Sequence, residues 1–323
     1  MHNEQLKVTV DLITSALNEQ DCLPELFQRL KEVFKSEQGY NFRIIIMDNG
    51  SYDRTWQIIS DEVKGANNVC GIKLSRTFSL DSAFTCGLDY ATAEIAILMT
   101  SDLQDPPELI HELLRKYEDG YDQVLVRITK RKSVPFFRRI FSWLFYALAN
   151  KMTSGVLPKS VSDFRLMSRK TYKSVSLLRE SHRFMRGIGS WVGFKTAIIN
   201  SERPPRFAGE SKWLNTSLVR VVSDATKSIL AYSSRPLSWV STIGILSSFV
   251  TSIGLISLVV FWLTGGGRPF EGFASIIVLI LVLFSILMLS IGIIAQYLSL
   301  MYEELKTRPL YIIDETVGNL QVH

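Results

Sequence analysis

The stretch ILMTSDLQDPPELI, residues 97–110, places two aspartates just after an apolar run and adds a double proline. One interpretation is structural, with Asp105 capping a helix whose first turn contains Pro106 and Pro107. The other is chemical, because a carboxylate at the end of a buried strand can bind a metal ion together with a phosphate. In that case Asp102 holds the metal. Residues elsewhere in the chain are needed to distinguish the structural interpretation from the chemical one.

Polar side chains also follow the other apolar runs in the first half of the chain. Taken singly, each fits a turn, because Asn, Asp, Ser and Gly form local hydrogen bonds there. Several carboxylates at one edge of one sheet instead indicate a ligand with hydroxyl groups and a cation, which fits a nucleotide-sugar better than a bare phosphate. The residues concerned are Asn18, Glu19, Asp48, Asn49, Ser51, Asp53, Ser75, Arg76, Ser101 and Asp102.

A glycine-rich phosphate loop is absent from the sequence. GxxxxGK[ST] does not occur, and no GxGxxG follows an apolar run. Without such a loop, a metal held by carboxylates is the simplest means of neutralising a diphosphate. Mg²⁺ and Mn²⁺ suit this task, since Mg²⁺ commonly binds through one or two carboxylates plus the phosphates of the substrate. The sequence therefore predicts Mg²⁺ or Mn²⁺ as cofactor.

The elements that position these residues alternate between strand-like and helix-like patterns. This alternation predicts βαβ units, an α/β fold and a mostly parallel sheet. Such sheets bind ligands at the carboxyl ends of their strands, near a switch in strand order. The apolar runs are residues 8–14, 42–47, 70–75, 94–99 and 122–127, and the amphipathic stretches are 23–34, 56–63, 82–91 and 108–117.

Composition excludes several classes of protein. The net charge of +5 comes without a basic stripe carrying aromatic residues, so we expect no nucleic-acid partner. The three cysteines fall at no metal-ligand spacing and the four histidines are scattered, which argues against a Cys/His metal centre. An odd number of cysteines indicates reduced thiols in a cytoplasmic setting. The polar N-terminus lacks the apolar run of a signal peptide.

Two uncharged stretches near the C-terminus predict membrane spans. No charged residue appears in 236–267 or in 272–302, and a span needs about 20 apolar residues. We expect spans at 237–263 and 273–298, joined as a hairpin with both flanks on the same side. Lys and Arg in the flanks place those flanks and the globular part in the cytoplasm. Two buried helices of a soluble core are the alternative.

Two further stretches suit helices that lie at a bilayer surface. Residues 130–152 combine aromatic side chains with Arg and Lys, and residues 214–230 are amphipathic. A buried core helix is the alternative for the first of them.

Motifs along nearly the whole chain resemble those of bacterial polyprenyl-phosphate glycosyltransferases, relatives of dolichol-phosphate mannose synthase. These are family-two glycosyltransferases of the GT-A fold with a C-terminal membrane hairpin. DLQDPPE and DFRLMSR, in that order before two apolar spans, are highly specific. The stretches that carry the resemblance are ALNE, DNGSYDRT, LSRTF, TCGLDYA, DLQDPPELI, DFRLMSR, RFMRGIGSWVGFK and RPLYII.

The resemblance implies an enzyme of the bacterial inner membrane, with its catalytic domain in the cytoplasm, that modifies cell-envelope glycans such as lipopolysaccharide or O-antigen. Such enzymes move a sugar from a nucleotide-sugar, usually a UDP-sugar, to undecaprenyl phosphate, with inversion at the anomeric carbon. The small membrane anchor also suggests a homo-oligomer. The segments implied are a donor-binding domain at 1–130, an acceptor-side region at 131–235, a transmembrane hairpin at 236–302 and a cytoplasmic tail at 303–323.

Roles follow from the resemblance for individual residues. Asp102 and Asp163 are the implied catalytic residues, with Asp102 on the metal and Asp163 on the acceptor side. The implied donor-binding residues are Asn18, Glu19, Asp48, Ser51, Arg76, Gln104 and Asp105, and those implied for the acceptor phosphate are Arg165, Arg203, Arg206 and Lys212.

The chain also departs from the family's pattern. Thr100 stands where the first acid of Asp-x-Asp is usual, and Ser162 replaces a usual glycine. Ser15 replaces a proline, and residues 128–129 replace an Arg pair. The loss at Thr100 leaves open a catalytically impaired homologue that serves as a membrane scaffold or partner subunit. A processive polysaccharide synthase fits less well, because QxxRW is absent and such an enzyme needs more spans.

Overall fold

The computed structural model describes residues 7–129, 161–181, 183–202, 204, 207, 235–264 and 273–320. The chain divides into two compact units. The first comprises Met1–Val221 together with Arg308–His323 and contains the β-sheet, and the second, Val222–Thr307, contains two long helices. The finer division into four segments stays a prediction.

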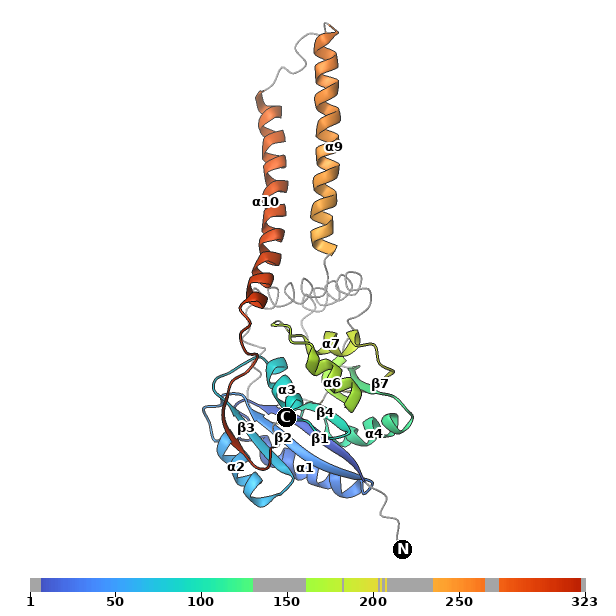
Figure 1. Cartoon of the computed structure of the whole chain (residues 1–323), viewed down its shortest axis with the longest axis vertical. Coiled ribbons are helices and arrows are strands. Elements are labelled where there is room, and N and C mark those ends of the chain that lie inside the picture. The colour runs from blue at the N-terminus through green and yellow to red at the C-terminus, as the bar shows by residue number, and fades with distance from the viewer. Residues whose placement is uncertain are drawn as a thin grey trace. The chain divides into compact units, whose positions relative to one another are not determined.

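The described residues of the first unit contain one sheet (Figure 1). Its strand order is β7-β5-β6-β4-β1-β2-β3-β8. The pairs β1–β2, β1–β4, β2–β3 and β5–β7 are parallel, and β4–β6, β5–β6 and β3–β8 are antiparallel. The predicted α/β fold with a mostly parallel sheet is confirmed, and the five predicted strands are β1 to β5. The strands are β1 (Val8–Ala16), β2 (Tyr40–Asp48), β3 (Val69–Leu74), β4 (Ile95–Thr100), β5 (Gln123–Ile128), β6 (Val161–Ser168), β7 (Thr196–Ser201) and β8 (Ile313–Val317).

The strand order switches direction at β1. The chain builds β2 and β3 on one side of β1 and then returns to place β4 on its other side. The ends of these strands are level, because Ala16 pairs with Asp48 and Ser15 with Thr100. The polar residues that follow β1, β2 and β4 therefore meet at the switch point, where open α/β sheets bind their ligands.

Helices cover both faces of the sheet. The first face carries α1, α2 and α4, whose apolar side chains share one buried cluster with alternate residues of the strands. The opposite face carries α3, α6 and α7, and α3 packs so closely that a Cβ on Gly87 would lie 2.3 Å from Cγ2 of Ile13. All four predicted helices are confirmed. The helices are α1 (Leu23–Ser36), α2 (Thr55–Gly65), α3 (Leu80–Asp89), the 3₁₀ turn η1 (Pro107–Leu109), α4 (Ile110–Glu118), α6 (Arg169–Leu177) and α7 (Met185–Trp191).

Helix α1 shows why the amphipathic pattern gave a correct prediction. Its apolar residues Leu23, Leu26, Phe27, Leu30 and Val33 recur at helical spacing and are all buried against the sheet. Burial of one such side chain contributes about 1.5–3 kcal/mol relative to exposure, so this face rather than intrinsic propensity stabilises the helix.

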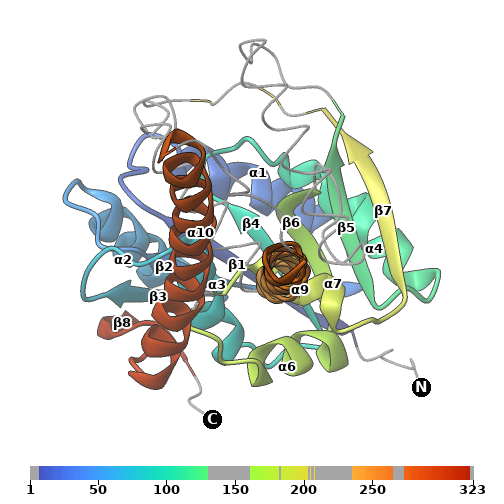
Figure 2. The same cartoon turned by 90° about the horizontal axis from the view of Figure 1, so that it is seen from above.

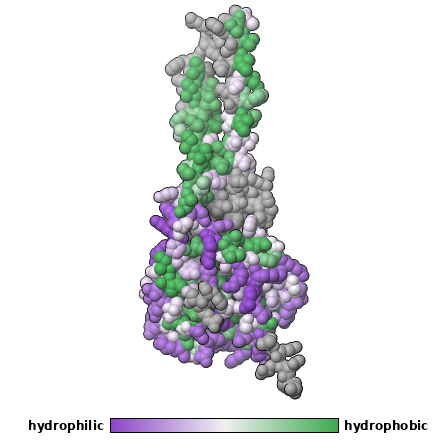
Figure 3. Space-filling view, viewed as in Figure 1, coloured by the Kyte–Doolittle hydropathy of each residue, from purple (hydrophilic) through white to green (hydrophobic). Residues whose placement is uncertain are grey.

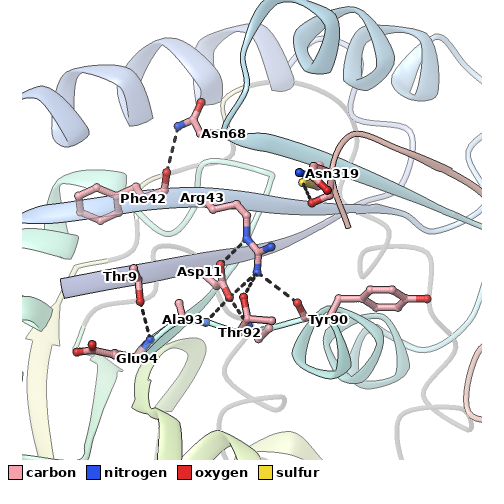
Figure 4. Close-up of polar contacts among 12 residues, drawn as sticks. Thr9, Asp11, Phe42, Arg43, Asn68, Tyr90, Thr92, Ala93, Glu94 and Asn319 are labelled. Atoms are coloured by element: carbon pink, nitrogen blue, oxygen red, sulfur yellow. Dashed lines mark hydrogen bonds and ion pairs between the residues drawn. The ribbon is translucent and has the colours of Figure 1, made fainter. Parts of the chain in front are cut away.

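A buried ion pair fixes the other end of the central strands (Figure 4). Arg43 of β2 donates to both carboxylate oxygens of Asp11 of β1, at 2.7 and 2.9 Å. The same carboxylate accepts the backbone N–H groups of Thr92 and Ala93, just before β4. Because a buried charge left without its partner is costly, this network holds β1, β2 and β4 in register and so aligns the strand ends that carry the site.

The second unit contains α9 (Arg235–Leu263) and α10 (Phe273–Leu305), which include the predicted spans. By length and composition, both helices are able to cross a membrane. Their surface is strongly apolar (Figure 3), with Phe249 and Leu289 more than 60% exposed. The predicted interfacial stretches at 130–152 and 214–230 lie outside the described residues.

Candidate active site

The loops after β1 and β2 interlock at the switch point. Ser51 Oγ accepts the N–H of Asn18 at 2.9 Å, and Asn18 Oδ1 accepts the N–H of Tyr52 at 3.0 Å. Asn18 has a φ of +53°, a left-handed conformation that Asn tolerates better than most residues. Glu19 N–H donates to Thr55 Oγ1 at 2.9 Å. The structure thus brings Asn18, Glu19 and Ser51 together, and their hydrogen bonds fix the two loops at the switch point.

Asp48 lies at the end of β2 with no exposed surface. Its Oδ1 accepts the N–H of Ser51 at 3.1 Å, whereas Oδ2 has no hydrogen-bond partner among the described residues. Burial raises the pKa of Asp48, although Ser51 and Lys73 act against this. A buried acceptor without a donor is costly. A ligand N–H or O–H that reaches this oxygen would therefore bind favourably.

Residues 75–79 connect β3 to α3 and lie beside the loop that follows β2. Asn49 fixes this segment, because its side chain accepts the N–H of Phe78 at 2.8 Å and donates to the Phe78 carbonyl at 2.9 Å. Gly50 is required, since its φ is +77° and a Cβ there would lie 2.6 Å from the nitrogen of Thr77. The exposed Arg76 guanidinium stacks on the Phe78 ring at 4.0 Å. The sequence indicated Arg76 but not this use of Asn49.

Two carboxylates converge on the hydroxyl of Thr100 at the end of β4. Thr100 Oγ1 lies 2.8 Å from Oδ1 of Asp102 and 3.0 Å from Oδ2 of Asp105. Asp102 Oδ1 also accepts the N–H of Gln104, and Leu103 between them has a φ of +57°. A hydroxyl has a single proton, so it serves one carboxylate at a time and leaves an excess of negative charge. Such a site attracts a cation.

Ser162 of β6 completes this group from the other side. Its hydroxyl donates to Oδ1 of Asp105 at 2.9 Å, so Asp105 is bounded by the hydroxyls of Thr100 and Ser162. These are two of the positions at which the chain departs from the family's pattern. Both departures therefore supply a hydroxyl to the same carboxylate, which the sequence did not reveal.

The described residues suit a metal that needs few protein ligands. They contain no group of three or more His, Cys, Asp and Glu side chains arranged to hold an ion. Asp102 is partly exposed, whereas Asp105 is 3% exposed and bound by two hydroxyls. Asp102 is therefore the better ligand, and Mg²⁺ or Mn²⁺ fits because phosphates and waters complete its coordination.

Asp163 of β6 pairs with a residue that the sequence analysis missed. Arg186 donates from Nε and Nη2 to the two carboxylate oxygens of Asp163, at 2.8 and 2.6 Å. The pair is largely buried, with 13% of the Asp163 side chain and 30% of the Arg186 side chain exposed. A bidentate pair of this kind fixes the orientation of the carboxylate as well as its charge. The motif RFMRGIGSW contains Arg186 and could have indicated it as a site residue, but the motif does not reveal Asp163 as its partner.

Arg165 has no exposed surface and binds the beginning of α7. Its Nη1 donates to the carbonyl of Met185 at 3.0 Å, and Asp81 of α3 accepts the N–H of Met185 at 3.0 Å. Burial lowers the pKa of Arg165 to about 10, so it stays charged, while burial and nearby Asp163 raise the pKa of Asp81 to about 6. These two side chains hold the residue before Arg186 and so place Arg186 against Asp163.

Of the residues predicted for the acceptor phosphate, Arg165 lies within the described part of the chain. The contacts of Arg165 lie inside the protein, which favours a structural role, and its contact with a phosphate stays a prediction. Arg203, Arg206 and Lys212 lie outside the described residues.

Thr100→Asp provides a test of the charge at this site. A third carboxylate beside Asp102 and Asp105 adds repulsion in the absence of metal and strengthens binding of a divalent cation. In EDTA the melting temperature is expected to fall by about 3 °C for each kcal/mol of repulsion. The Kd for Mn²⁺, measured by electron paramagnetic resonance, is expected to fall about tenfold.

Thr100→Asn is the matched control, because it has the size of aspartate without the charge. Equal Mn²⁺ affinity in the Thr100→Asp and Thr100→Asn variants would show that the cation binds elsewhere.

Comparisons with known proteins identify the family of the chain. The sequence model described as glycosyl transferase family 2 matches residues 11–176. An uncharacterised glycosyltransferase of Synechocystis sp. is 34% identical over 313 residues, 97% of each chain. The bactoprenol glucosyl transferase of Shigella phage SfX is 33% identical over 311 residues, 94% of this chain and 98% of that protein.

A solved structure shares the GT-A-like fold. It is glucosyl-3-phosphoglycerate synthase from Mycobacterium tuberculosis in complex with Mn²⁺, UDP and phosphoglyceric acid. The TM-score is 0.50 at 17% identity, over 69% of this chain and 76% of that one. The family match, the two relatives and the shared fold lead to one conclusion: the chain belongs to glycosyl transferase family 2.

Proposed function

We propose that this protein is a membrane-anchored, inverting glycosyltransferase that moves a sugar from a UDP-sugar to undecaprenyl phosphate. The observation that carries the proposal is the group of Asp102, Thr100 and Asp105 at the switch point, joined through Ser162 to the strand that presents Asp163. The relatives named bactoprenol glucosyl transferases support this choice of acceptor, since bactoprenol is a polyprenyl lipid.

The donor side would bind the nucleotide through the loops after β1, β2 and β3. Asp48 would accept a hydrogen bond from the base or ribose, and Asn18, Glu19 and Ser51 would line the pocket. Arg76 would contact the donor from the neighbouring segment, with Gln104 and Asp105 shaping the site around the diphosphate. Asp102 would hold Mg²⁺ or Mn²⁺, which supplies charge neutralisation to the departing diphosphate.

The acceptor side requires orientation more than proton removal. A phosphate oxygen is already anionic near pH 7, so the attacking group needs no strong base. Asp163, held by Arg186, would orient the acceptor or stabilise positive charge at the anomeric carbon. Arg203, Arg206 and Lys212 remain the proposed cations for the lipid phosphate.

The path of the chain supports a hairpin anchor in the bacterial inner membrane. Residues up to Val221 and residues from Arg308 onward belong to the same compact unit, and β8 pairs with β3. Two membrane spans between parts of one folded unit would return the chain to the side from which it started. The Lys and Arg residues in the flanks support the cytoplasm as that side. Association of copies through the hairpin stays a proposal.

The alternative, a catalytically impaired scaffold or partner subunit, rests on the missing carboxylate at Thr100. Against it, the Thr100 hydroxyl contacts both remaining carboxylates, so this position stays part of an intact polar group. Buried polar groups are costly unless they are paired, and a chain that needs no site has little reason to keep them.

An assay of UDP release separates the two functions. Purified full-length protein is incubated with a panel of UDP-sugars and Mg²⁺ or Mn²⁺, with and without undecaprenyl phosphate. We expect one donor to give UDP release that depends on the lipid and stops in EDTA. Folded protein that releases no UDP from any donor would favour the scaffold.

A further inference from the structure

The chain returns from α10 to the sheet and adds β8 along the outer edge of β3 (Figure 2). We call residues 311–319 the C-terminal strap. Gly71 pairs with Val317 at one end, and at the other end the N–H of Ser75 donates to the Ile312 carbonyl at 2.9 Å. The strap therefore reaches the residue that directly precedes Arg76.

Side-chain contacts fix the strap to three elements. Trp56 of α2 donates from Nε1 to Glu315 at 3.1 Å, and Lys73 of β3 lies 3.2 Å from Asp314. The Tyr311 hydroxyl donates to Asp89 at the end of α3, at 2.7 Å. Arg179 makes a bidentate pair with the same carboxylate, so the Tyr311 contact belongs to a network. Because these contacts reach α2, β3 and α3, the strap binds the domain surface in one specific position.

Two glycines allow the strap to pack closely. A Cβ on Gly71 would lie 2.8 Å from Val317 Cγ2 and 2.7 Å from Ile59 Cγ2. Gly318 has a φ of +90°, and a Cβ there would lie 2.8 Å from the carbonyl oxygen of Val69. Beyond it, the Asn319 carbonyl accepts a hydrogen bond from the Cys70 thiol, with an S···O distance of 3.4 Å. The domain surface is therefore shaped to receive this segment.

The strap and Asn49 hold opposite ends of the same segment. Asn49 binds Phe78 near the end of residues 75–79, and the strap binds Ser75 at their beginning. Without the strap, β3 becomes an edge strand and Ser75 loses its backbone partner. Arg76 would then lie on a loop that is fixed at one end only. Binding of a ligand would have to order that loop, and the lost conformational entropy would weaken the affinity.

We propose that the C-terminal strap is a positioning element of the donor site, which fixes residues 75–79 so that Arg76 meets the nucleotide-sugar. The proposal rests on the function proposed above and extends it. In this proposal the C-terminal strap, which follows α10 in the chain, also contributes to donor binding. Donor affinity then depends on residues more than 230 positions away from Arg76 in the sequence.

Two truncated forms of the full-length protein test the proposal. One ends after Leu310 and lacks the strap, and the matched control ends after Leu320 and keeps it. With UDP and Mg²⁺ as the probe, calorimetry is expected to show a Kd at least tenfold higher without the strap and unchanged in the control. The KM for the sugar donor should rise in parallel, while the KM for undecaprenyl phosphate stays within twofold.

A higher KM for the sugar donor with an unchanged KM for undecaprenyl phosphate would not arise from a purely structural role, since general unfolding changes the KM for both substrates. Unchanged UDP affinity in folded protein that ends after Leu310 overturns the proposal and leaves the proposed function intact. Failure of the wild-type protein to bind UDP overturns both.

Hydrogen exchange on the intact wild-type protein gives a second test that needs no variant to fold. Addition of UDP and Mg²⁺ is expected to slow exchange in residues 75–79 and in residues 311–319 together. Slower exchange in 75–79 with no change in 311–319 would contradict the proposal.

Discussion

Asp102→Asn is expected to lower sugar transfer by at least ~100-fold, since electrostatic stabilisation of a leaving group commonly contributes 10²–10³-fold. The substitution keeps the size of the side chain and its ability to accept the Thr100 hydroxyl at the Oδ1 position. It removes the charge, and within the described part of the chain Asp105 is the one other carboxylate that contacts that hydroxyl. Binding of Mn²⁺, followed by electron paramagnetic resonance, should weaken together with turnover.

Asp61→Asn is a suitable control for this measurement. Asp61 is an exposed residue of α2 that pairs with Lys64 in the next turn, and such surface pairs contribute little to stability. Its neutralisation changes the net charge by the same amount and should leave both turnover and Mn²⁺ binding unchanged. If Asp102→Asn kept more than a tenth of the wild-type activity, the metal would have to be held by other residues.

Asp163→Asn is the second substitution with a large expected effect. Turnover at saturating undecaprenyl phosphate should fall by about 100-fold. The Kd for UDP should stay within twofold, because Asp163 lies on β6 and outside the loops that we propose for nucleotide binding. The asparagine cannot accept both hydrogen bonds of Arg186, so the orientation of the side chain is lost along with its charge.

Arg186→Lys separates these two losses. Lysine keeps a positive charge near Asp163 but cannot donate two parallel hydrogen bonds, so we expect an intermediate decrease of about tenfold. Full turnover of Asp163→Asn at saturating lipid, alongside an inactive Asp102→Asn, would rule out a catalytic role for Asp163.

The sequence predicted the central strands because their burial is encoded locally. Each of β1 to β5 is an apolar run long enough for one strand, and the helices between them have a clear apolar face. β8 escaped prediction because its sequence, IDETV, is short and its middle residues are exposed. Its position depends on pairing with β3 and on residues such as Trp56 and Asp89, which are remote in the sequence.

The candidate site was predictable to a similar extent. Residues at the ends of parallel strands were expected to meet, and the structure places Asp48, Thr100 and the residues around Asn18 at one edge. The partners of these residues were not predictable, because spacing along the chain does not report contacts between remote segments. Thr100 looked like the loss of a ligand, and the structure adds that its hydroxyl contacts both neighbouring carboxylates.

Identification of the lipid product is a direct test of whether this protein transfers a sugar to undecaprenyl phosphate. Purified protein, undecaprenyl phosphate and the active UDP-sugar are incubated with Mn²⁺, and the lipid is isolated for mass spectrometry and NMR. We expect undecaprenyl phosphate that carries a single sugar, with the anomeric configuration inverted relative to the donor. A lipid that carries several sugars, a retained configuration, or no sugar-lipid product from folded protein would contradict this expectation.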